Sequence, residues 1–317
     1  MKQFLSTEDV QSVDGLIDLA LRYKADPFLD QTIGARKTLG LLFMNPSLRT
    51  RISTQVAAKN LGMEVIVFNV DKDGWQLEFT DGAVMNGNTT EHVREAAAVL
   101  GQYVDILGVR SFPTLTDRER DSSEQVINSF VRFAGVPVVS LESATLHPLQ
   151  SLADLVTIRE LMKSGKKPKV VMTWAPHVKA LPQAVPNSFA QWVNAWGGAE
   201  FVITHPEGYA LDERFTKGAT ITGDRQAALA GADFIYAKNW SSFHDYGKIL
   251  NTDPSWTVNE ASLKNAPDAR IMHCLPVRRN VVIADEILDG PRSVVVQEAG
   301  NRVWAAQAVL SEILRHS

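Results

Sequence analysis

The stretch TLGLLFMNPSLRTRISTQVAAKNLG (residues 38–62) decides the fold class. Its first seven residues are almost all apolar and predict a buried strand over 38–44. Residues 49–62 then predict a helix, which Gly62 closes because glycine accepts the left-handed backbone that often ends a helix. A strand that runs directly into a helix is the opening of a β-α-β unit, and such units build parallel sheets.

The same alternation continues along the chain and restarts after residue 149. A helix over 149–163 is predicted to bridge two halves. The first half adds strands over 64–70, 104–110 and 136–142 and helices over 91–103 and 124–135. The second half has predicted strands over 167–174, 200–206, 232–238, 270–276 and 293–298 and helices over 186–198 and 303–316.

These patterns predict an α/β fold with two doubly wound parallel-sheet domains of similar size. The expected domains are 1–148 and 149–300, with the C-terminal helix of 301–317 packing back on the first. In such sheets a ligand binds in the crevice outside the carboxyl ends of the strands.

Composition argues against several classes of function. The chain has 317 residues, a formal net charge of −4 and a pI near 6.0, which argues against nucleic acid or an anionic membrane as a partner. Its single cysteine, Cys274, leaves no disulfide framework and indicates a reducing compartment. The N-terminus turns acidic at once, unlike a signal peptide, and no apolar run approaches the ~20 residues of a membrane span. We therefore expect a soluble, cytoplasmic protein.

The residues after the first strand have the makings of an anion site. A helix N-terminus carries unpaired N–H groups and a partial positive charge, Ser47 and Thr50 add hydroxyl donors, and Arg49 adds a guanidinium suited to phosphate oxygens. The alternative is that Ser47 only caps the helix while Arg49 and Arg51 are solvated. The Walker and GxGxxG patterns are absent, and no histidine stands at ligand spacing from Cys274, so neither a cofactor nor a metal is expected.

Three motifs resemble the transcarbamylase family, the aspartate and ornithine carbamoyltransferases. They are SLRTR (47–51), HPLQ (147–150) and HCLP (273–276), each at the end of a predicted strand and in this order. Further segments resemble the N-acylornithine branch of that family: GW (74–75), MTWAPH (172–177), LPQAVPNS (181–188), YAKNW (236–240) and HCLPVRRN (273–280). The Ser-Met-Gly segment with which ornithine enzymes hold the free amino acid is absent, which argues against free ornithine.

The resemblance implies a carbamoyl phosphate site. Ser47, the Leu48 backbone, Arg49 and Thr50 would hold the phosphate. Arg110 would reach phosphate and carbonyl oxygen, His147 would polarise that oxygen, and Gln150 would accept from the carbamoyl nitrogen. Cys274 and Leu275 would offer backbone carbonyls near the reacting amine. The plainer alternatives are a structural histidine, a surface arginine, and a Cys274 thiol that is only a small buried apolar group.

A second group would contact the acylornithine. Glu142 would orient the substrate amine or accept its proton, and Lys238 or Arg278 would bind the substrate carboxylate. His177 and Lys179 would contact the acyl end, and Trp75 would be a lid residue that reaches the neighbouring subunit's site. A solvated Glu142 and a surface Lys238 are the alternatives.

The resemblance also implies a homotrimer with shared active sites and a knotted chain, with residues 175–186 as the knot's loop. In the acylornithine branch the residue before the Glu-His at 91–92 separates acetyl enzymes, with glutamate, from succinyl enzymes, with proline. Here it is Thr90, and Val282 stands where the acetyl enzyme has a modified lysine. Both favour N-succinyl-L-ornithine over N-acetyl-L-ornithine. The rivals are the N-acetyl form, another amine, or a non-catalytic binder of a phosphometabolite.

Overall fold

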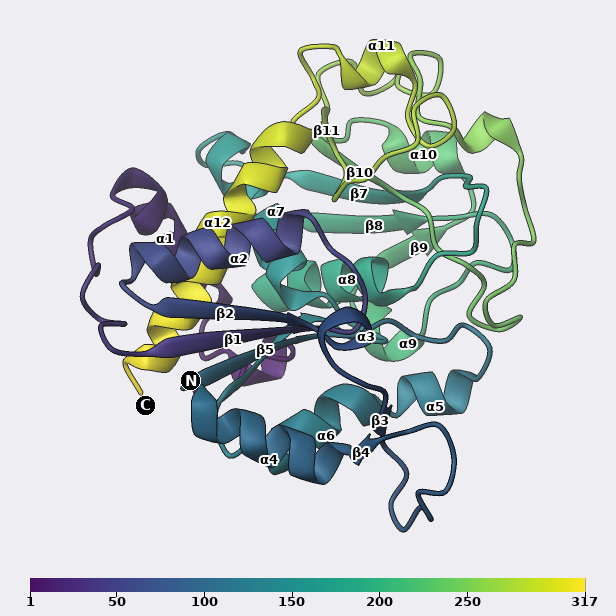
Figure 1. Ribbon diagram of the computed structural model, residues 1–317. Coiled ribbons are helices and arrows are strands. Elements are labelled where there is room, and N and C mark those ends of the chain that lie inside the picture. Colours follow the sequence, from purple (N-terminus) through teal and green to yellow (C-terminus); the bar gives the residue numbers. More distant parts are fainter. Residues whose placement is uncertain (317) are drawn as a thin grey trace. The chain divides into compact units, whose positions relative to one another are not determined.

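The chain divides into two compact units, which the computed structural model describes for residues 1–316 (Figure 1). Unit 1 is Met1–Leu149 together with the chain from Arg302 onward, and unit 2 is Gln150–Asn301. The boundaries expected from the sequence were 148/149 and 300/301. Among the helices of residues 1–316, none has both the length and the run of apolar side chains that a bilayer span requires.

Unit 1 is built on a four-stranded parallel sheet in the order β2-β1-β5-β6. Its strands are β1 (Thr38–Phe43), β2 (Glu64–Asn69), β5 (Ile106–Arg110) and β6 (Val138–Glu142), and the pair β3 (Leu77–Glu78) and β4 (Glu91–His92) lies apart from it. Its helices are α1 (Val13–Ala25), α2 (Arg49–Asn60), α3 (Val70–Asp73), α4 (Val93–Tyr103), α5 (Arg118–Ser122), α6 (Gln125–Phe133) and a 3-10 turn η1 (Thr7–Asp9).

Unit 2 is built on a five-stranded parallel sheet in the order β11-β10-β7-β8-β9. Its strands are β7 (Lys169–Trp174), β8 (Glu200–Thr204), β9 (Thr220–Thr222), β10 (Phe234–Lys238) and β11 (Arg270–Met272). Its helices are α8 (Ala184–Trp196), α9 (Glu213–Thr216), α10 (Arg225–Leu229), α11 (Asp285–Leu288) and a 3-10 turn η2 (Pro254–Trp256). Helices α7 (Pro148–Leu161) and α12 (Val295–Leu314) each run from one unit into the other.

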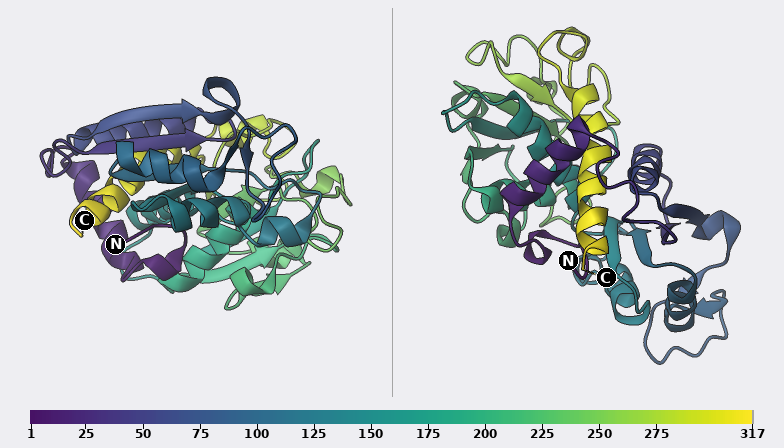
Figure 2. Two further views of the ribbon diagram at one scale, coloured as in Figure 1. Left: turned by 60° about the horizontal axis from the view of Figure 1, so that its bottom comes forward. Right: turned by 90° about the vertical axis from the view of Figure 1, so that its left-hand side faces the viewer.

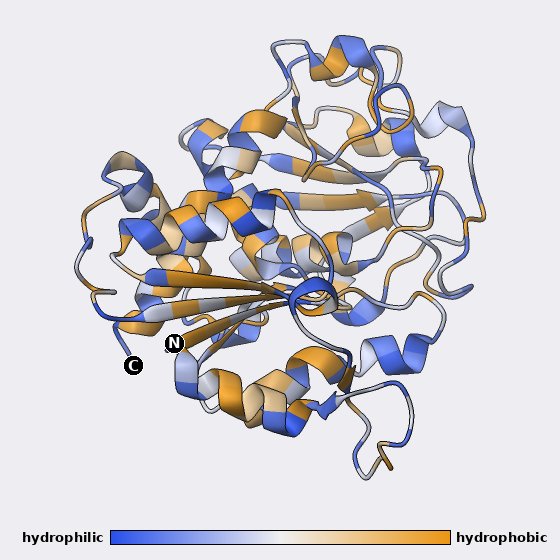
Figure 3. Ribbon diagram, in the orientation of Figure 1, coloured by the Kyte–Doolittle hydropathy of each residue, from blue (hydrophilic) through white to orange (hydrophobic). Residues whose placement is uncertain are grey.

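The central strands of each sheet are buried and apolar along their length rather than alternating, whereas the edge strands β2 and β9 are partly exposed. All five residues of β5 and of β10 are buried, and Figure 3 shows β1 and β8 as mostly hydrophobic ribbons. Parallel strands covered on both faces have this composition. In consequence, the polar groups of both units collect where the strands end.

Gly62 closes α2 as predicted. Its φ of +83° is in the left-handed region, and a Cβ built there would lie 2.3 Å from the carbonyl oxygen of Gln31. Only glycine fits both requirements.

One predicted strand is wrong. The long helix α12 begins at Val295, inside the predicted strand 293–298, and Ser293 just before it makes an isolated bridge to Ile271. Valine-rich sequence favours strands. Here Val294, Val295 and Glu298 are buried whereas Val296 is 80% exposed, which is the spacing of a helix face.

The last half of α12 belongs to unit 1. Gln307 accepts from Asn60 at 2.9 Å and donates to the carbonyl of Pro27 at 2.8 Å. The N-terminal amine of Met1 contacts the carbonyl of Glu312 at 3.4 Å, and Figure 2 shows the two chain ends side by side. This return brings Arg302, the first residue of the unit 1 portion of α12, to the site described next.

Candidate active site

Polar side chains of unit 1 meet at the carboxyl ends of β1, β5 and β6. Arg110, the last residue of β5, pairs with Glu142, the last residue of β6, with 2.7 Å between its Nη1 and the Glu142 Oε2. The same guanidinium donates to the hydroxyl of Thr50 at 3.3 Å. His147 Nε2 lies 3.6 Å from Glu142 Oε2. The structure therefore brings together four residues that the sequence singled out.

These four side chains are buried. Exposed fractions are 1% for Thr50, 7% for Arg110, 6% for Glu142 and 4% for His147. The alternatives of a surface arginine at 110 and a solvated carboxylate at 142 are therefore wrong.

Sequence reasoning missed a member of this cluster, Arg302. It is 5% exposed, and its Nη2 donates to the Thr50 hydroxyl at 2.6 Å. The signal in the sequence was weak, because a single arginine within a helix near the chain end is usually a surface residue. Only the return of α12 to unit 1 places it beside Thr50, 252 residues away.

The cluster keeps His147 neutral. Burial, and then the charges of Arg302 and Arg110, hold the pKa of His147 well below its usual value. A neutral imidazole has one N–H donor and one acceptor nitrogen, so His147 can donate to a polarised oxygen without carrying charge.

The start of α2 completes this cationic face. Leu48 is the N-cap and no side chain caps the helix, so the interpretation of Ser47 as a cap is wrong. Leu48 is 69% exposed, Ser47 and Arg49 are half-buried, and the helix runs for 12 residues. Its unpaired N–H groups and partial positive charge adjoin Arg49 and Thr50, which is the arrangement that binds anions.

Unit 2 gathers cations at the carboxyl ends of its own strands. Arg278 Nε lies 3.2 Å from His177 Nε2, and the backbone N–H of Lys179 donates to His177 Nδ1 at 3.0 Å. Burial lowers the pKa of His177, a backbone hydrogen bond with Lys179 opposes this, and the charges of Lys238, Arg278 and Lys179 lower it further. Lys238 is 7% exposed, so it is not the surface lysine that the sequence allowed.

The turn after β11 contains the HCLP motif. His273 and Cys274 are buried, at 3% and 9% exposed, and the backbone N–H of Leu275 donates to His273 Nδ1 at 2.8 Å. Leu275 has a φ of +54°, an uncommon conformation for a residue other than glycine. Gln150 is buried in α7 of unit 2, and its Nε2 donates to Asp154 at 2.8 Å.

Trp75 and Thr90 lie near the small β3–β4 pair of unit 1. Trp75 is 54% exposed, and its indole N–H donates to Glu91 at 2.8 Å. The exposed Thr90 donates its backbone N–H to the Gln76 carbonyl at 3.0 Å. Glu91–His92 form β4, and His92 caps α4, so the residues expected to start this helix precede it.

Arg279 is committed elsewhere. It pairs with Asp285 at 2.9 Å and with Asp289 at 2.7 Å. The structure therefore gives this side chain two carboxylate partners on the α11 side of unit 2, in place of a substrate carboxylate. Across the described part of the chain, no three His, Cys, Asp or Glu side chains lie close enough to hold a metal ion.

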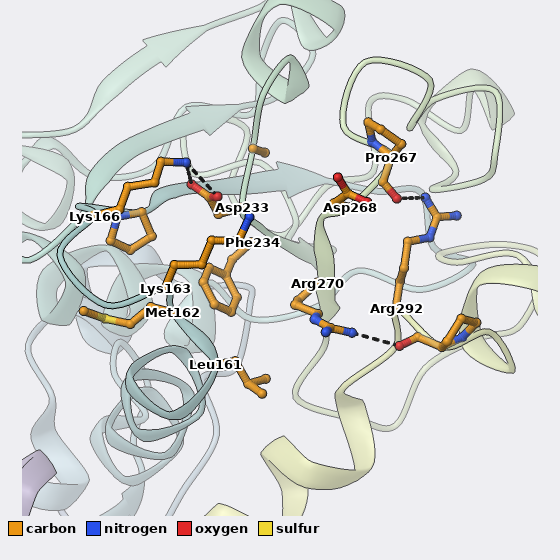
Figure 4. Close-up of a pocket in the computed structure, with 13 residues that line it drawn as sticks. Leu161, Met162, Lys163, Lys166, Asp233, Phe234, Pro267, Asp268, Arg270 and Arg292 are labelled. Atoms are coloured by element: carbon orange, nitrogen blue, oxygen red, sulfur yellow. Dashed lines mark hydrogen bonds and ion pairs between the residues drawn. The ribbon is translucent and has the colours of Figure 1, made fainter.

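A surface pocket of unit 2 lies at the opposite ends of the strands. It has a volume of about 280 Å³, and its lining includes Pro168, Phe234 and Arg270, which stand at the amino ends of β7, β10 and β11. Figure 4 shows Lys166 paired with Asp233, and Arg270 and Arg292 bonded to backbone carbonyls. These polar side chains of the pocket are thus bonded to other groups of the protein. The pocket does not include the unit 2 residues described above.

Comparison with known proteins agrees with this geometry. Residues 2–160 match the sequence profile of "Aspartate/ornithine carbamoyltransferase, carbamoyl-P binding domain", and residues 183–313 match that of "Aspartate/ornithine carbamoyltransferase, Asp/Orn binding domain". The chain belongs to the aspartate/ornithine carbamoyltransferase family. The family and the two-domain α/β fold predicted from the sequence are therefore confirmed.

Two relatives that match over their full length are carbamoyltransferases of N-acylated ornithines. The N-succinylornithine carbamoyltransferase of Bacteroides fragilis (strain 638R) is 49% identical over 318 residues, covering 100% of this chain and 99% of the relative. The N-acetylornithine carbamoyltransferase of Xanthomonas campestris pv. campestris is 34% identical over 340 residues, covering 100% and 99%.

Solved structures of this carbamoyltransferase family share the fold of this chain. One is acetylornithine transcarbamylase complexed with acetylcitrulline, at a TM-score of 0.92 and 33% identity, covering 99% of each chain. Another is an N-acetyl-L-ornithine transcarbamylase mutant, with a glutamate replaced by alanine, complexed with carbamyl phosphate and N-succinyl-L-norvaline. It matches at a TM-score of 0.90 and 33% identity, covering 99% of this chain and 100% of that one.

Proposed function

We propose that this enzyme transfers the carbamoyl group of carbamoyl phosphate to the δ-amine of N-succinyl-L-ornithine. The products would be N-succinyl-L-citrulline and phosphate, in arginine biosynthesis. The observation that carries the transfer chemistry is the buried cluster of Arg110, Arg302, Thr50 and a neutral His147 beside the α2 N-terminus. The acyl group is supported by the 49% identity to an N-succinylornithine enzyme.

The phosphate would bind at the start of α2. Ser47, the Leu48 backbone, Arg49 and Thr50 supply donors, and the helix dipole favours the dianion. Arg110 and Arg302 both donate to the hydroxyl of Thr50, so both guanidiniums stand where phosphate and carbonyl oxygens would lie. Glu142 would hold Arg110 and His147 in place, since it contacts both.

The carbamoyl carbon is the reacting centre. The δ-amine nitrogen forms a bond to it, the bond between the carbon and the bridging phosphate oxygen breaks, and the leaving phosphate takes up the proton that the amine loses. His147 and the two arginines would stabilise negative charge on the carbonyl oxygen, which is the largest single contribution in many acyl transfers. Gln150 would accept from the carbamoyl nitrogen, and the backbone carbonyls of Cys274 and Leu275 would orient the amine.

The acylornithine would bind through the cations of unit 2. Lys238 and Arg278 would take the α-carboxylate, and His177 and Lys179 would lie at the acyl end, because these four groups adjoin one another. Thr90 would accommodate the succinyl carboxylate, since it lacks the negative charge of a glutamate. Lys179 remains the candidate to pair with that carboxylate, whereas Arg279 is paired with aspartates.

The assembly is also proposed from resemblance. We propose a cytoplasmic homotrimer with active sites shared between subunits, in which Trp75 completes the neighbour's site. A chain knotted around residues 175–186 belongs to the same proposal.

The test is carbamoylation of three amines side by side: N-succinyl-L-ornithine, N-acetyl-L-ornithine and L-ornithine. The succinyl substrate should have much the highest kcat/KM, and ornithine should be nearly inert. Thr90→Glu should shift preference towards the acetyl substrate by about one to two decades, because a like charge in a closed site costs a few kcal/mol. A wild type that prefers N-acetyl-L-ornithine would establish the second candidate, which the 34% identical relatives favour.

A second experiment tests the assignment of the phosphate site. Arg49→Ala should lower turnover about 10²–10³-fold through loss of one charge-assisted contact, with unchanged circular dichroism. Near-normal turnover in the purified variant would exclude the α2 N-terminus as the phosphate site and would favour a binder of another metabolite.

A further inference from the structure

A fully buried pair of acidic side chains joins α7 to α12 within unit 2. Asp154 and Glu298 are both 0% exposed, and their carboxyl groups are hydrogen-bonded to each other. Neighbouring contacts place the two helices side by side there, since Asn301 donates to Thr157 at 2.9 Å and to Glu160 at 2.8 Å. The close approach of the two acids is thus part of a continuous helix contact.

Each acid also accepts from a residue that the proposed reaction uses. Asp154 Oδ1 accepts from Gln150 Nε2 at 2.8 Å, and Glu298 Oε2 accepts from the backbone N–H of His273 at 2.9 Å. The remaining oxygen of each carboxyl group, Asp154 Oδ2 and Glu298 Oε1, is fully buried as well. A chain of hydrogen bonds thus runs from Gln150 through both acids to the turn at 273–275.

The contact between the acids requires a proton. An ionised carboxylate only accepts hydrogen bonds, so two carboxylates cannot bond to each other unless one is protonated. Two adjacent negative charges in a buried site are also strongly unfavourable. Cys274 and Tyr236, the other titratable groups with a described interaction with Glu298, are not cations.

The same surroundings identify the protonated member. Burial, and then the charges of Asp154 and Cys274, raise the pKa of Glu298 well above its usual value. Burial likewise raises the pKa of Tyr236 far above its usual value, so the phenol stays neutral. The raised pKa therefore favours Glu298 as the member that carries the proton.

We propose that Asp154 and Glu298 share one proton as a hydrogen-bonded pair, and that this pair is a positioning device for both sides of the reacting centre. By accepting from Nε2, Asp154 fixes the Gln150 amide so that its Oε1 is the acceptor presented to other groups. By accepting from His273, Glu298 fixes the turn that carries the Cys274 and Leu275 carbonyls. The positioning part rests on the proposed function, whereas the shared proton does not.

The shared proton is tested without any assay of activity. Wild type and Glu298→Gln would be compared by infrared spectroscopy near neutral pH, with Glu312→Gln, the same change on the same helix, as control. The C=O stretch of a protonated carboxylic acid should be present in wild type and in the control and missing in Glu298→Gln. A wild-type spectrum without this band would overturn the shared proton.

Stability against pH gives a second, independent measure. Native Glu298 keeps its proton above the unfolded pKa, whereas the unfolded chain releases it, so wild-type stability should fall as pH rises. Relative to Glu298→Gln, which has no proton to lose, the wild-type unfolding constant should rise about tenfold per pH unit from about pH 5 to about pH 7. Parallel curves for the two proteins would contradict the proposal.

Kinetics test the positioning role. Glu298→Gln keeps a donor for Asp154 and an acceptor for His273, so its kcat should stay within about threefold of wild type. Glu298→Leu removes both, and kcat should fall about 10–100-fold while the KM for carbamoyl phosphate changes little, because the phosphate contacts lie in unit 1. Equal losses in both variants would overturn the positioning role. An infrared band with no turnover on any amine would instead count against the proposed function alone.

Discussion

Thr50 is the residue at which two arginines from distant parts of the chain meet. Arg110 comes from the end of β5 and Arg302 from α12, and both donate to one hydroxyl of 1% exposure. Bringing two cations this close costs energy, and Glu142, at 2.7 Å from Arg110, offsets part of that cost. A bound dianion would relieve that repulsion, which is a physical reason for carbamoyl phosphate to bind here.

Arg302→Gln should therefore reduce activity, because it removes the positive charge that would stabilise the carbonyl oxygen and the phosphate. The expected loss in kcat/KM is about 10²–10³-fold, measured by steady-state kinetics with carbamoyl phosphate varied. Arg315→Gln is the matched control, because Arg315 lies beyond the end of the same helix and pairs with Asp30 on the surface. If the two variants lose activity equally, Arg302 has only a structural role.

The residues that sequence reasoning found and the one that it missed differ in a physical way. Arg110, Glu142 and His147 lie at or just after strand ends, which parallel-sheet topology brings to one edge. Arg302 is positioned by a helix that leaves unit 2 and returns to unit 1, and no local pattern encodes that return. Arg279 shows the same limit, because its partners, Asp285 and Asp289, lie at the two ends of α11 and no local pattern predicts these ion pairs.

At the scale of elements, periodicity and glycine placement were sufficient for the strands of the two main sheets except β9, and for α2, α4, α6, α7, α8 and part of α12, whereas α1 and the short helices were not predicted. Strands β1, β5 and β10 end within one residue of their predicted ends, because a polar residue follows each apolar run. The valines at 294–296 misled the prediction, because β-branched composition speaks for a strand. Glu298, Asn301 and Arg302 are buried on one face of the helix, and this burial outweighs the local preference for a strand. Because these buried residues are polar, the helix face does not appear in the sequence as a periodic pattern of apolar residues.

The end of α2 gives an element-scale prediction. Gly62→Ala should destabilise the protein by about 3 kcal/mol or more, since the added Cβ meets both the left-handed backbone and the Gln31 carbonyl. Gly135→Ala is the matched control: Gly135 follows the end of α6 in the same unit with a φ of +70°, and nothing lies within 4 Å of its Cβ position. It should cost only about 1–2 kcal/mol. Urea denaturation followed by circular dichroism measures both, and equal losses would show that the Gln31 contact is unimportant.

At the scale of the whole molecule, the proposal of active sites shared between subunits depends on Trp75. Trp75 is 54% exposed, and its indole bonds to Glu91 rather than packing in a core. The neighbouring pocket, of about 280 Å³ and lined by Phe68, Val99, Leu100 and Tyr103, is largely apolar. Exposed aromatic residues of this kind are typical of contacts between subunits, which agrees with the proposal that the Trp75 loop serves a second copy of the chain.

A subunit-mixing experiment tests that proposal. Trp75→Ala and Arg49→Ala variants should each be nearly inactive, the first lacking the lid residue it gives its neighbour and the second lacking a phosphate contact. The two variants are mixed in equal amounts, and their subunits are allowed to exchange within the symmetric ring. A site is then complete when its Arg49 comes from a Trp75→Ala subunit and its Trp75 comes from an Arg49→Ala subunit. Random mixing makes about one quarter of the sites complete, so activity should recover to about that fraction of wild type. Mixing Trp75→Ala with the double variant Arg49→Ala, Trp75→Ala completes no site and is the control. With exchange verified by affinity-tag capture, activity that stays at the level of the parents would place Trp75 in its own subunit's site.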